Sequence, residues 1–224
     1  MFDIDLFRII EKHSYDYRSH YRFYQVMLNI KDVTLSGSHV ILRPPRSDDL
    51  EGLRDAATDG EIWKNPYALF PHVEEIPIYL QQLIDHDETI LPFIAVLKLS
   101  EQIVGTTRFL NIDSHNCRLE IGHTWIAKSF RRSFVNTEAK FLMLQHAFEE
   151  LNCIAVEIRT DVLNEVSRKA IERLGAKQDG ILRNHKIMRD GRIRNTVCYS
   201  IIKEEWADVK EVLLRKISNY SIRN

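Results

Sequence analysis

The sequence predicts a mixed α/β domain in which a central, mostly antiparallel sheet is flanked by helices. Two observations favour this fold class. Residues 92–126 contain short runs of alternating apolar residues joined by brief turn signals, which is typical of a meander of strands. Segments with apolar residues at helical spacing lie before and after these runs. A chain of 224 residues fits one large domain, alone or with an appendage.

The elements follow in order from these patterns. Pro44 and Pro45 end a first strand at residues 39–43, and Ser47 caps the helix that follows. The remaining elements are expected as a helix at about 76–87, strands at 92–99, 102–110 and 116–126, a helix ending near 151, a strand at 153–160, a helix at 164–174, a hairpin at 181–202 and a helix at 204–217. An Asp190-Gly191 turn joins the two hairpin strands.

Three segments are expected along the chain: an N-terminal extension (1–34), a main domain (35–206) and a C-terminal helix with its tail (207–224). Leu6, Ile9, Ile10 and His13 could form one stripe of a helix within the extension. The extension is then either an extra helix, packed on the domain or on a partner subunit, or a poorly ordered segment.

The composition argues against several classes of protein. Lysine plus arginine (31) nearly balances aspartate plus glutamate (32), and the formal net charge of -1 gives no overall attraction for nucleic acid or an anionic membrane. Cys117, Cys153 and Cys198 lie far apart in apolar runs and predict three buried thiols. The histidine and cysteine spacings match no metal site. With no secretory signal and no run of about 18 apolar residues, a cytoplasmic protein is expected.

Residues 125–151 combine an apolar strand end, a short basic turn and an amphipathic helix. The first turn of a helix offers unpaired amides and partial positive charge to an anion, and Arg131 and Arg132 strengthen that field. The segment therefore predicts a phosphate-binding turn or, equally, a basic loop before an ordinary surface helix.

The helix of this segment has its apolar residues at helical spacing, from Phe141 to Leu151. Asn136 or Thr137 can cap it. Glu138 and Lys140 are expected on other faces than the apolar one.

Seven motifs occur in order over about residues 35–206: LSGSHVILRP, IVGTTRF, LEIGHTWI, RRSFVNTEAK, TDVLNEVSRKAIERLGA, GILRNH and DGRIRNTVCYSII. Through them the chain resembles the GNAT superfamily of acetyl-coenzyme A dependent N-acetyltransferases, in particular the subgroup of the ribosomal-protein N-terminal acetyltransferases. The resemblance implies the acyl-CoA N-acyltransferase fold with a splayed sheet. It also implies acetyl-CoA as co-substrate and no metal.

The resemblance implies that the strand end and the turn after it bind the cofactor. The implied residues are Trp125, Ile126, Arg131, Arg132, Ser133, Phe134, Val135, Asn136 and Thr137. The family has small residues at two of these positions, where the backbone approaches the diphosphate, and this chain has Phe134 and Asn136 there. Trp125 fits the wall of the site and the core equally well.

Glu120 is the implied catalytic base. Strand alternation places it opposite the core row formed by Leu119 and Ile121, from where it could reach an amine through a water molecule. The other interpretation is a cross-strand ion pair with Arg108 or a similar residue. By the same count His123 lies on the core row and is expected to pack or to form a hydrogen bond.

Asn164 and Ser167 open the helix after residues 153–160. The resemblance implies that Asn164 bonds to the pantetheine arm and that Ser167 gives a proton to the departing sulfur. Otherwise Asn164 is an N-cap and Ser167 a first-turn residue. By analogy Trp63 and Phe70 line the acceptor side of the cleft, or they simply pack over a sheet edge.

The predicted function is acetyl transfer from acetyl-CoA to a primary amine by direct attack in a ternary complex. The acceptor is a protein or peptide amino terminus, or a small amino-acid-like metabolite. An α-amine with a pKa of roughly 7.7–8.0 is partly neutral at physiological pH, so a weak base suffices. Two other functions stay open: a module that binds coenzyme A without turnover, and an interaction protein that uses its aromatic N-terminal segment. A homodimer is compatible with the sequence.

Overall fold

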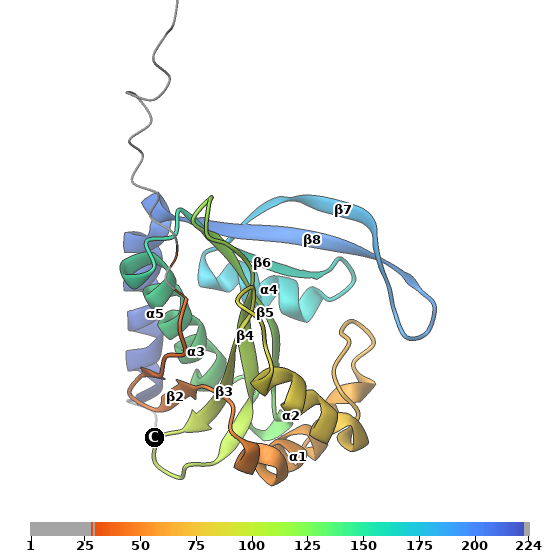
Figure 1. Cartoon of the computed structure of the whole chain (residues 1–224). Helices are drawn as coiled ribbons and strands as arrows, with labels where there is room; N and C mark the ends of the chain where they lie inside the picture. The colour runs from red at the N-terminus through yellow and green to blue at the C-terminus, as the bar shows by residue number, and fades with distance from the viewer. Residues whose placement is uncertain (1–27, 29, 222–224) are drawn as a thin grey trace, which may run out of the picture.

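The protein is described by a computed structural model at residue 28 and residues 30–221. The expected N-terminal helix, with its stripe from Leu6 to His13, lies outside the described residues. Leu28 is buried against the main core. The described chain folds into one sheet of eight strands with helices on both faces (Figure 1).

The sheet has the strand order β1-β2-β3-β4-β5-β6-β8-β7. The strands are β1 (Leu35–Ser36), β2 (Val40–Arg43), β3 (Leu91–Leu97), β4 (Ile103–Asp113), β5 (Arg118–Ile126), β6 (Ala155–Asp161), β7 (Lys177–Ile187) and β8 (Ile193–Ile202). Within the described residues, β5 and β6 form the parallel pair and the other neighbours are antiparallel. The mostly antiparallel sheet predicted from the meander is confirmed, and the strand limits differ from the expected ones by a few residues.

Five α-helices flank the sheet (Figure 1). They are α1 (Leu50–Thr58), α2 (Ile76–Ile84), α3 (Phe134–Gln145), α4 (Glu165–Leu174) and α5 (Trp206–Ser221), and a π-helical segment (His146–Glu150) extends α3. Short 3-10 turns lie at Ser47–Asp49, Ile62–Lys64, Val73–Glu75, Lys128–Phe130 and Lys203–Glu205. No helix among the described residues is long and apolar enough to span a membrane.

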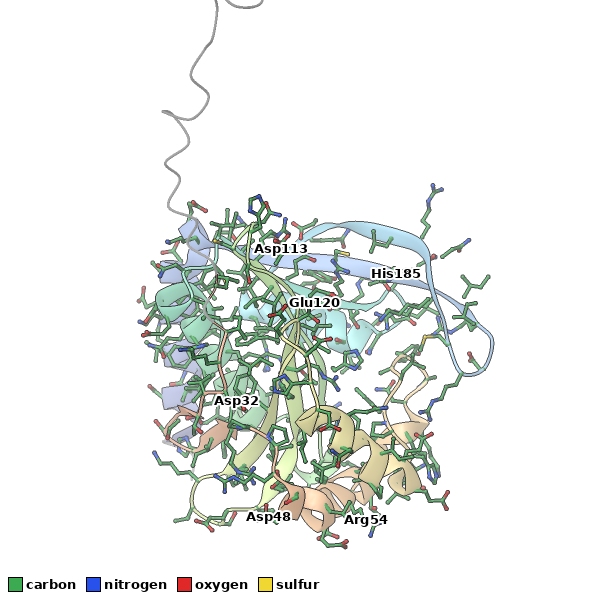
Figure 2. All side chains as sticks on the ribbon, viewed as in Figure 1. Asp32, Asp48, Arg54, Asp113, Glu120 and His185 are labelled. Carbon is green, nitrogen blue, oxygen red and sulfur yellow. The ribbon has the colours of Figure 1, made fainter. Side chains whose placement is uncertain are left out.

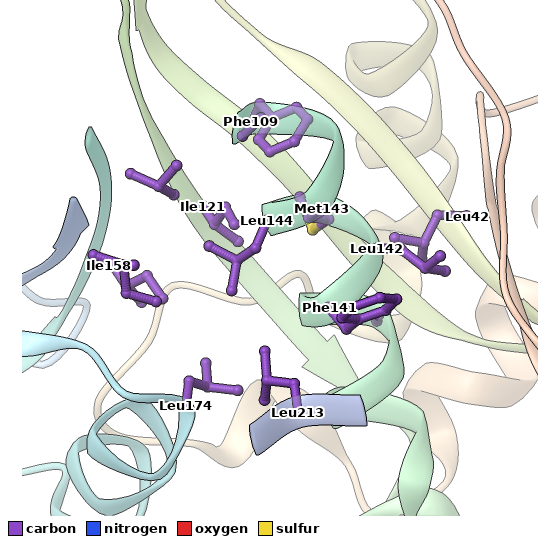
Figure 3. Close-up of a cluster of buried hydrophobic side chains, with 14 of the residues drawn as sticks. Leu42, Phe109, Ile121, Phe141, Leu142, Met143, Leu144, Ile158, Leu174 and Leu213 are labelled. Carbon is purple, nitrogen blue, oxygen red and sulfur yellow. The ribbon is translucent and has the colours of Figure 1, made fainter. Parts of the chain in front are cut away.

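The main core lies between the sheet and the layer formed by α3, α4 and α5. Helix α3 runs through its middle, with Met143 and Leu144 fully buried (Figure 3). On α5, Trp206 packs beside Phe141 with ring centroids 6.3 Å apart, so α5 belongs to the same core. Burial of each such side chain contributes about 1.5–3 kcal/mol.

Two charged residues of α3, which the sequence places on other faces than the apolar one, are buried. Glu138 accepts a hydrogen bond from the backbone amide of His39 at 2.9 Å. Lys140 donates from Nζ to the hydroxyls of Thr107 at 3.1 Å and Thr124 at 2.6 Å. The spacing of residues within one helix shows its most apolar face, but not how many other elements cover it.

A smaller core lies on the opposite face, between β3 to β5 and helices α1 and α2. Trp125 belongs to it: the side chain is 3% exposed, and its Nε1 donates to the hydroxyl of Tyr79 at 3.3 Å. The sequence left open whether Trp125 lines the site or belongs to the core, and the structure places its side chain in the core. The described helices on this face do not extend over β6, β8 and β7 (Figure 1).

Strand β5 contains a bulge at His123, whose φ is 47°. Pairing shifts between Arg108–Gly122 and Thr106–Trp125, so that two residues of β5 face one residue of β4. The alternation reverses there. His123 is exposed, and its predicted place on the core row was wrong because counting along a strand does not detect a bulge.

The two predicted ends of α4 are confirmed: Asn164 is the N-cap and Gly175, with φ 104°, is the C-cap. The cap predicted for α3 was wrong, since the helix begins at Phe134 and Ser133 caps it. Of the three cysteines that were predicted to be buried, Cys153 is buried, whereas Cys117 and Cys198 are half-buried.

Candidate active site

The sheet opens between β5 and β6. The two strands pair only from Arg118 to Glu120 on β5 and from Ala155 to Glu157 on β6, although β5 continues to Ile126 and β6 to Asp161. Beyond Glu120, the edge of β5 away from β4 therefore has no strand partner in the described sheet. Such an edge presents backbone N–H and C=O groups to an extended ligand. The splayed sheet implied by the resemblance is present.

The N-termini of α3 and α4 lie at the open end of this gap. Because β5 and β6 are parallel, their carboxyl ends point the same way, and each leads into a helix after a short connection. Each helix therefore offers first-turn amides, with their partial positive charge, at that end of the sheet. The two helices touch where Arg173, in the last turn of α4, donates to the hydroxyl of Thr137, in the first turn of α3, at 3.4 Å.

The turn between β5 and α3 is held by its own side chains. Arg131 donates from Nε to the carbonyl oxygen of Ile126 at 3.0 Å. The hydroxyl of Ser133 donates to the carbonyl oxygen of Phe130 at 2.6 Å and accepts from the amide of Val135 at 3.2 Å. Arg132 is exposed, with φ 59°. The turn presents an arginine and helix amides at one place, the combination that suits an anion.

The other predicted residues of this turn are less accessible. Val135 and Thr137 are buried, and Asn136 is half-buried. Phe134 is also half-buried and packs on His39, with ring centroids 4.8 Å apart. For these four positions only the backbone and the edges of the side chains can meet a ligand.

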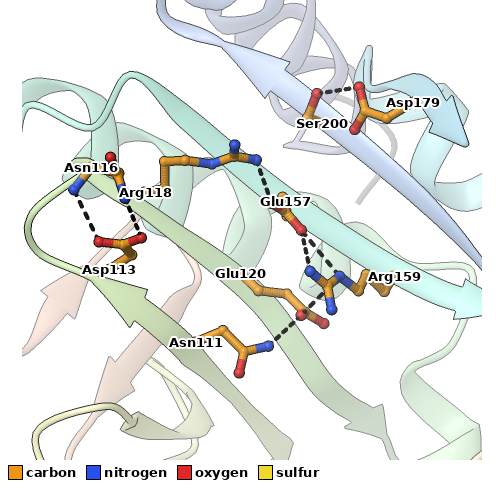
Figure 4. Close-up of polar contacts among 9 residues, drawn as sticks. All are labelled: Asn111, Asp113, Asn116, Arg118, Glu120, Glu157, Arg159, Asp179 and Ser200. Carbon is orange, nitrogen blue, oxygen red and sulfur yellow. Dashed lines mark hydrogen bonds and ion pairs between the residues drawn. The ribbon is translucent and has the colours of Figure 1, made fainter. Parts of the chain in front are cut away.

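Glu120 lies beside the start of the gap, on the face that α3 does not cover (Figures 2 and 4). Its side chain is 9% exposed, accepts a hydrogen bond from Asn111 Nδ2 at 2.8 Å and lies 3.3 Å from Arg159 Nε. Burial raises the pKa of Glu120, while Arg159 and Asn111 act against that rise. A carboxyl group in such surroundings can take and release a proton nearer to neutral pH than an exposed one.

The ion pair expected as the alternative role for Glu120 involves a different arginine. Arg108 donates instead to the hydroxyl of Tyr79 at 3.3 Å, and Arg159 is the cation next to Glu120. Arg159 also pairs with Glu157 at 2.7 Å, and this network lines a cavity of about 540 Å³ (Figure 4).

Sequence reasoning missed Asn111 and Arg159. For Arg159 a signal existed, since the alternation in residues 155–161 places Glu157 and Arg159 on one face of β6, opposite the buried Val156 and Ile158. Asn111 has φ 49°, beside a register shift in β4 that the sequence pattern does not mark.

Asn164 and Ser167 are engaged with each other in the described chain. The Oδ1 of Asn164 accepts a hydrogen bond from the backbone amide of Ser167 at 3.0 Å, which is an N-cap interaction. Ser167 is half-buried and its hydroxyl forms no hydrogen bond within the described residues, so it can turn toward a ligand. The interpretation of Asn164 as an N-cap is therefore confirmed.

Trp63 and Phe70 are half-buried and pack against the smaller core. Trp63 also lies beside His72, with ring centroids 4.7 Å apart. Their loop reaches the β7–β8 hairpin: Arg192 donates to the carbonyl oxygen of Pro66 at 3.1 Å. The loop therefore borders the face on which Glu120 lies, although both aromatic rings contribute to packing.

The comparison with known proteins decides the family. A family model described as "Acetyltransferase (GNAT) domain" matches residues 39–177. The chain belongs to the GNAT acetyltransferase family. The matched residues include the opened strands, the turn before α3 and Glu120.

Similar proteins agree with this family. A Bacillus subtilis (strain 168) protein named "Putative ribosomal N-acetyltransferase YdaF" is 36% identical over 108 residues, which is 48% of this chain and 58% of the relative. The chain thus matches less than two thirds of the length of its curated relatives. A GCN5-related N-acetyltransferase from Brucella melitensis superposes with a TM-score of 0.75 at 26% identity, over 83% of this chain and 86% of that one.

The fold alone is shared with RimJ of Mycobacterium smegmatis, whose structure was solved in complex with CoA-disulfide. The TM-score is 0.67 at 22% identity, over 79% of this chain and 88% of that one.

The residues of this chain fit acetyl-CoA. The unpaired edge of β5 can hold an extended arm, and the turn from Arg131 to the start of α3 can hold phosphate. That turn contains no glycine. The first-turn amides of α3 follow Ser133 directly, and the side chain of Ser133 accepts a hydrogen bond from the amide of Val135. Within the described residues, no group of three or more His, Cys, Asp or Glu side chains could hold a metal ion.

Proposed function

We propose that the protein transfers the acetyl group of acetyl-CoA to the primary amine of a protein or peptide amino terminus. The observation that carries the proposal is the position of Glu120, a nearly buried carboxyl group beside the gap between β5 and β6. A relative named as a ribosomal N-acetyltransferase favours a protein acceptor over a metabolite.

Bound acetyl-CoA supplies an activated acetyl thioester. Glu120 takes a proton from the acceptor ammonium, directly or through a water molecule, and so makes the amine a nucleophile. The unpaired edge of β5 orients the thioester arm, and its N–H groups are suited to stabilise the developing oxyanion. Ser167 gives a proton to the departing sulfur, and solvent restores it.

An α-amine suits this site better than a lysine side chain. With a pKa of roughly 7.7–8.0 an α-amine is partly neutral at physiological pH. A lysine side chain has a pKa near 10.4, so its deprotonation at that pH costs about 4 kcal/mol. Burial raises the pKa of Glu120, but this single carboxyl group is still a weak base. A weak base is enough to deprotonate an α-amine.

Release of free thiol from acetyl-CoA with a panel of peptides and small amines tests the proposal. Glu120→Gln keeps the shape of the side chain and should lower kcat by about 10²–10⁴-fold. Glu157→Gln is the matched control: it removes a carboxylate from the same network, next to Arg159, but not the proposed base. Equal losses in both variants, or unchanged turnover in Glu120→Gln, would remove Glu120 from the mechanism.

The panel also separates the proposal from a module that binds coenzyme A without turnover. Such a module would bind acetyl-CoA and release no thiol with any amine. Deletion of residues 1–26 tests the third function, an interaction protein. If the shortened protein keeps its fold and its assembly state, this third function is excluded.

A further inference from the structure

The carboxylates on the open face of the sheet are already paired. On the face that carries Glu120, Asp161 pairs with Arg192 at 2.6 Å and Glu157 pairs with Arg159 at 2.7 Å. Glu120 itself lies 3.3 Å from the same arginine. Asp161, Glu157 and Glu120 each already lie beside an arginine, Arg192 or Arg159.

Arg108 is a further cation on this face. It extends from β4, where it faces Gly122 of β5, and its guanidinium lies over the ring of Tyr79 at 5.7 Å from the centroid. The guanidinium of Arg108 donates a hydrogen bond to the neutral hydroxyl of the same tyrosine. Within the described residues it forms no ion pair.

Lys186 and Arg194 are two more cations, on the β7–β8 hairpin. They are direct partners in the register of the two strands, and like charges in that position destabilise a hairpin. Arg194 donates to the hydroxyl of Thr196 at 2.9 Å and to the carbonyl oxygen of Tyr67 at 3.4 Å, both neutral acceptors. Neither cation forms an ion pair within the described part of the chain, although the charges of Asp161 and Glu120 act on Arg194 and the charge of Lys186 acts on Glu120. An anion between the two cations would lower their repulsion.

The charges of all three cations act on His123, the neighbour of Gly122 on β5. His123 follows Glu120 by three residues on β5, and the charge of Lys186 also acts on Glu120. The positive field therefore lies beside the proposed base, in a part of the face that solvent reaches.

We propose that Arg108, Lys186 and Arg194, the cation cluster, bind a carboxylate of the acceptor while its amine lies at Glu120. The inference rests on the proposed function and names its substrate class: a primary amine that carries a carboxylate on the same molecule. An acidic residue close to a peptide amino terminus supplies both groups. So does a free amino acid, and the experiment separates the two sources.

The test compares kcat/KM for two pairs of acceptors. The first pair is a Ser-Asp and a Ser-Asn peptide of otherwise equal sequence; the second is a free amino acid and its carboxamide. The wild type should prefer the carboxylate member of one pair by about 10-fold or more, as expected for a charge-assisted contact. The pair that shows the preference identifies the source.

Lys186→Met is the informative variant, because this side chain is exposed and forms no hydrogen bond or ion pair within the described residues that the fold would lose. It should reduce the preference to about 3-fold or less, and Arg108→Gln should do the same. Arg183→Met, which removes an exposed cation from the same strand, should keep the wild-type preference. No preference in the wild type, or the same preference in Lys186→Met, would overturn the cation cluster.

Binding is measured separately from turnover, by fluorescence anisotropy of a Ser-Asp peptide labelled at its carboxyl end. If no amine is acetylated but this peptide binds the wild type and binds Lys186→Met more weakly by about 10-fold, the proposed function fails and the cation cluster stands. If amines are acetylated and the acceptor carboxylate has no effect, the proposed function stands and the cation cluster fails.

Discussion

Lys140 leads to a prediction on stability that can be worked out from the structure. Its ammonium is buried under the sheet and bonds only to the hydroxyls of Thr107 and Thr124, with no carboxylate beside it among the described residues. Burial lowers the pKa of Lys140 to about 7. An unfolded lysine titrates near 10.4, so the charged form costs the native state roughly 4–5 kcal/mol.

The sign follows from proton counting. Below pH 7 both states hold the proton and the full penalty applies. Between pH 7 and about 10 the unfolded state holds the proton and the native state does not, so the free energy of unfolding rises with pH. From pH 7 to pH 9 this one group should add about 2 kcal/mol, or about 4–8 °C in Tm for a chain of this length.

Urea unfolding of the wild type and of Lys140→Met at pH 6, 7, 8 and 9 measures this effect. The wild type should gain about 2 kcal/mol relative to the variant between pH 7 and pH 9. In the variant the two threonine hydroxyls can still bond to each other, since they lie 2.7 Å apart. Lys169→Met, at an exposed lysine of α4, should follow the wild type. A difference between wild type and Lys140→Met that stays constant over this range would refute the reasoning.

Two further predictions concern the backbone around the gap. At Gly105, with φ 154°, an added Cβ would lie 2.0 Å from the carbonyl oxygen of Trp125, so Gly105→Ala should lower the free energy of unfolding by about 2 kcal/mol or more in urea unfolding. Gly180→Ala is the control, because an added Cβ there has no atom within 4 Å, and it should lower the free energy of unfolding much less. Equal losses would contradict the close approach of β4 to β5. Asn164→Ala should cost about 1 kcal/mol through the lost cap and should also weaken acetyl-CoA, whereas Asn164→Asp should keep the cap. Unchanged cofactor affinity in Asn164→Ala would leave Asn164 as a cap only.

The sequence predicts the elements whose signals are local. Asn164 and Gly175 mark both ends of α4, and the Asp190-Gly191 turn fixes the hairpin and with it the opposition of Lys186 and Arg194. Alternation places Glu120 opposite the core row, as observed.

The features that the sequence did not predict depend on contacts between distant segments. The bulge at His123 arises where β4 and β5 approach each other, and it reverses the alternation beyond Gly122. Lys140 is buried because the sheet closes over the face of α3 that carries it. Asn111 and Arg159 reach Glu120 from two neighbouring strands, and their register is set only when the sheet forms.

The central claim is that the turn from Arg131 into α3 holds the diphosphate of acetyl-CoA while the acetyl end lies beside Glu120. A calorimetric titration of the folded, reduced protein with acetyl-CoA and with S-acetylpantetheine, which lacks the diphosphate, tests it most directly. We predict saturable binding of one acetyl-CoA per chain and at least about 10-fold weaker binding of S-acetylpantetheine, because the fragment loses the charge-assisted phosphate contacts. No saturable binding of acetyl-CoA, or equal binding of the two compounds, would contradict the claim.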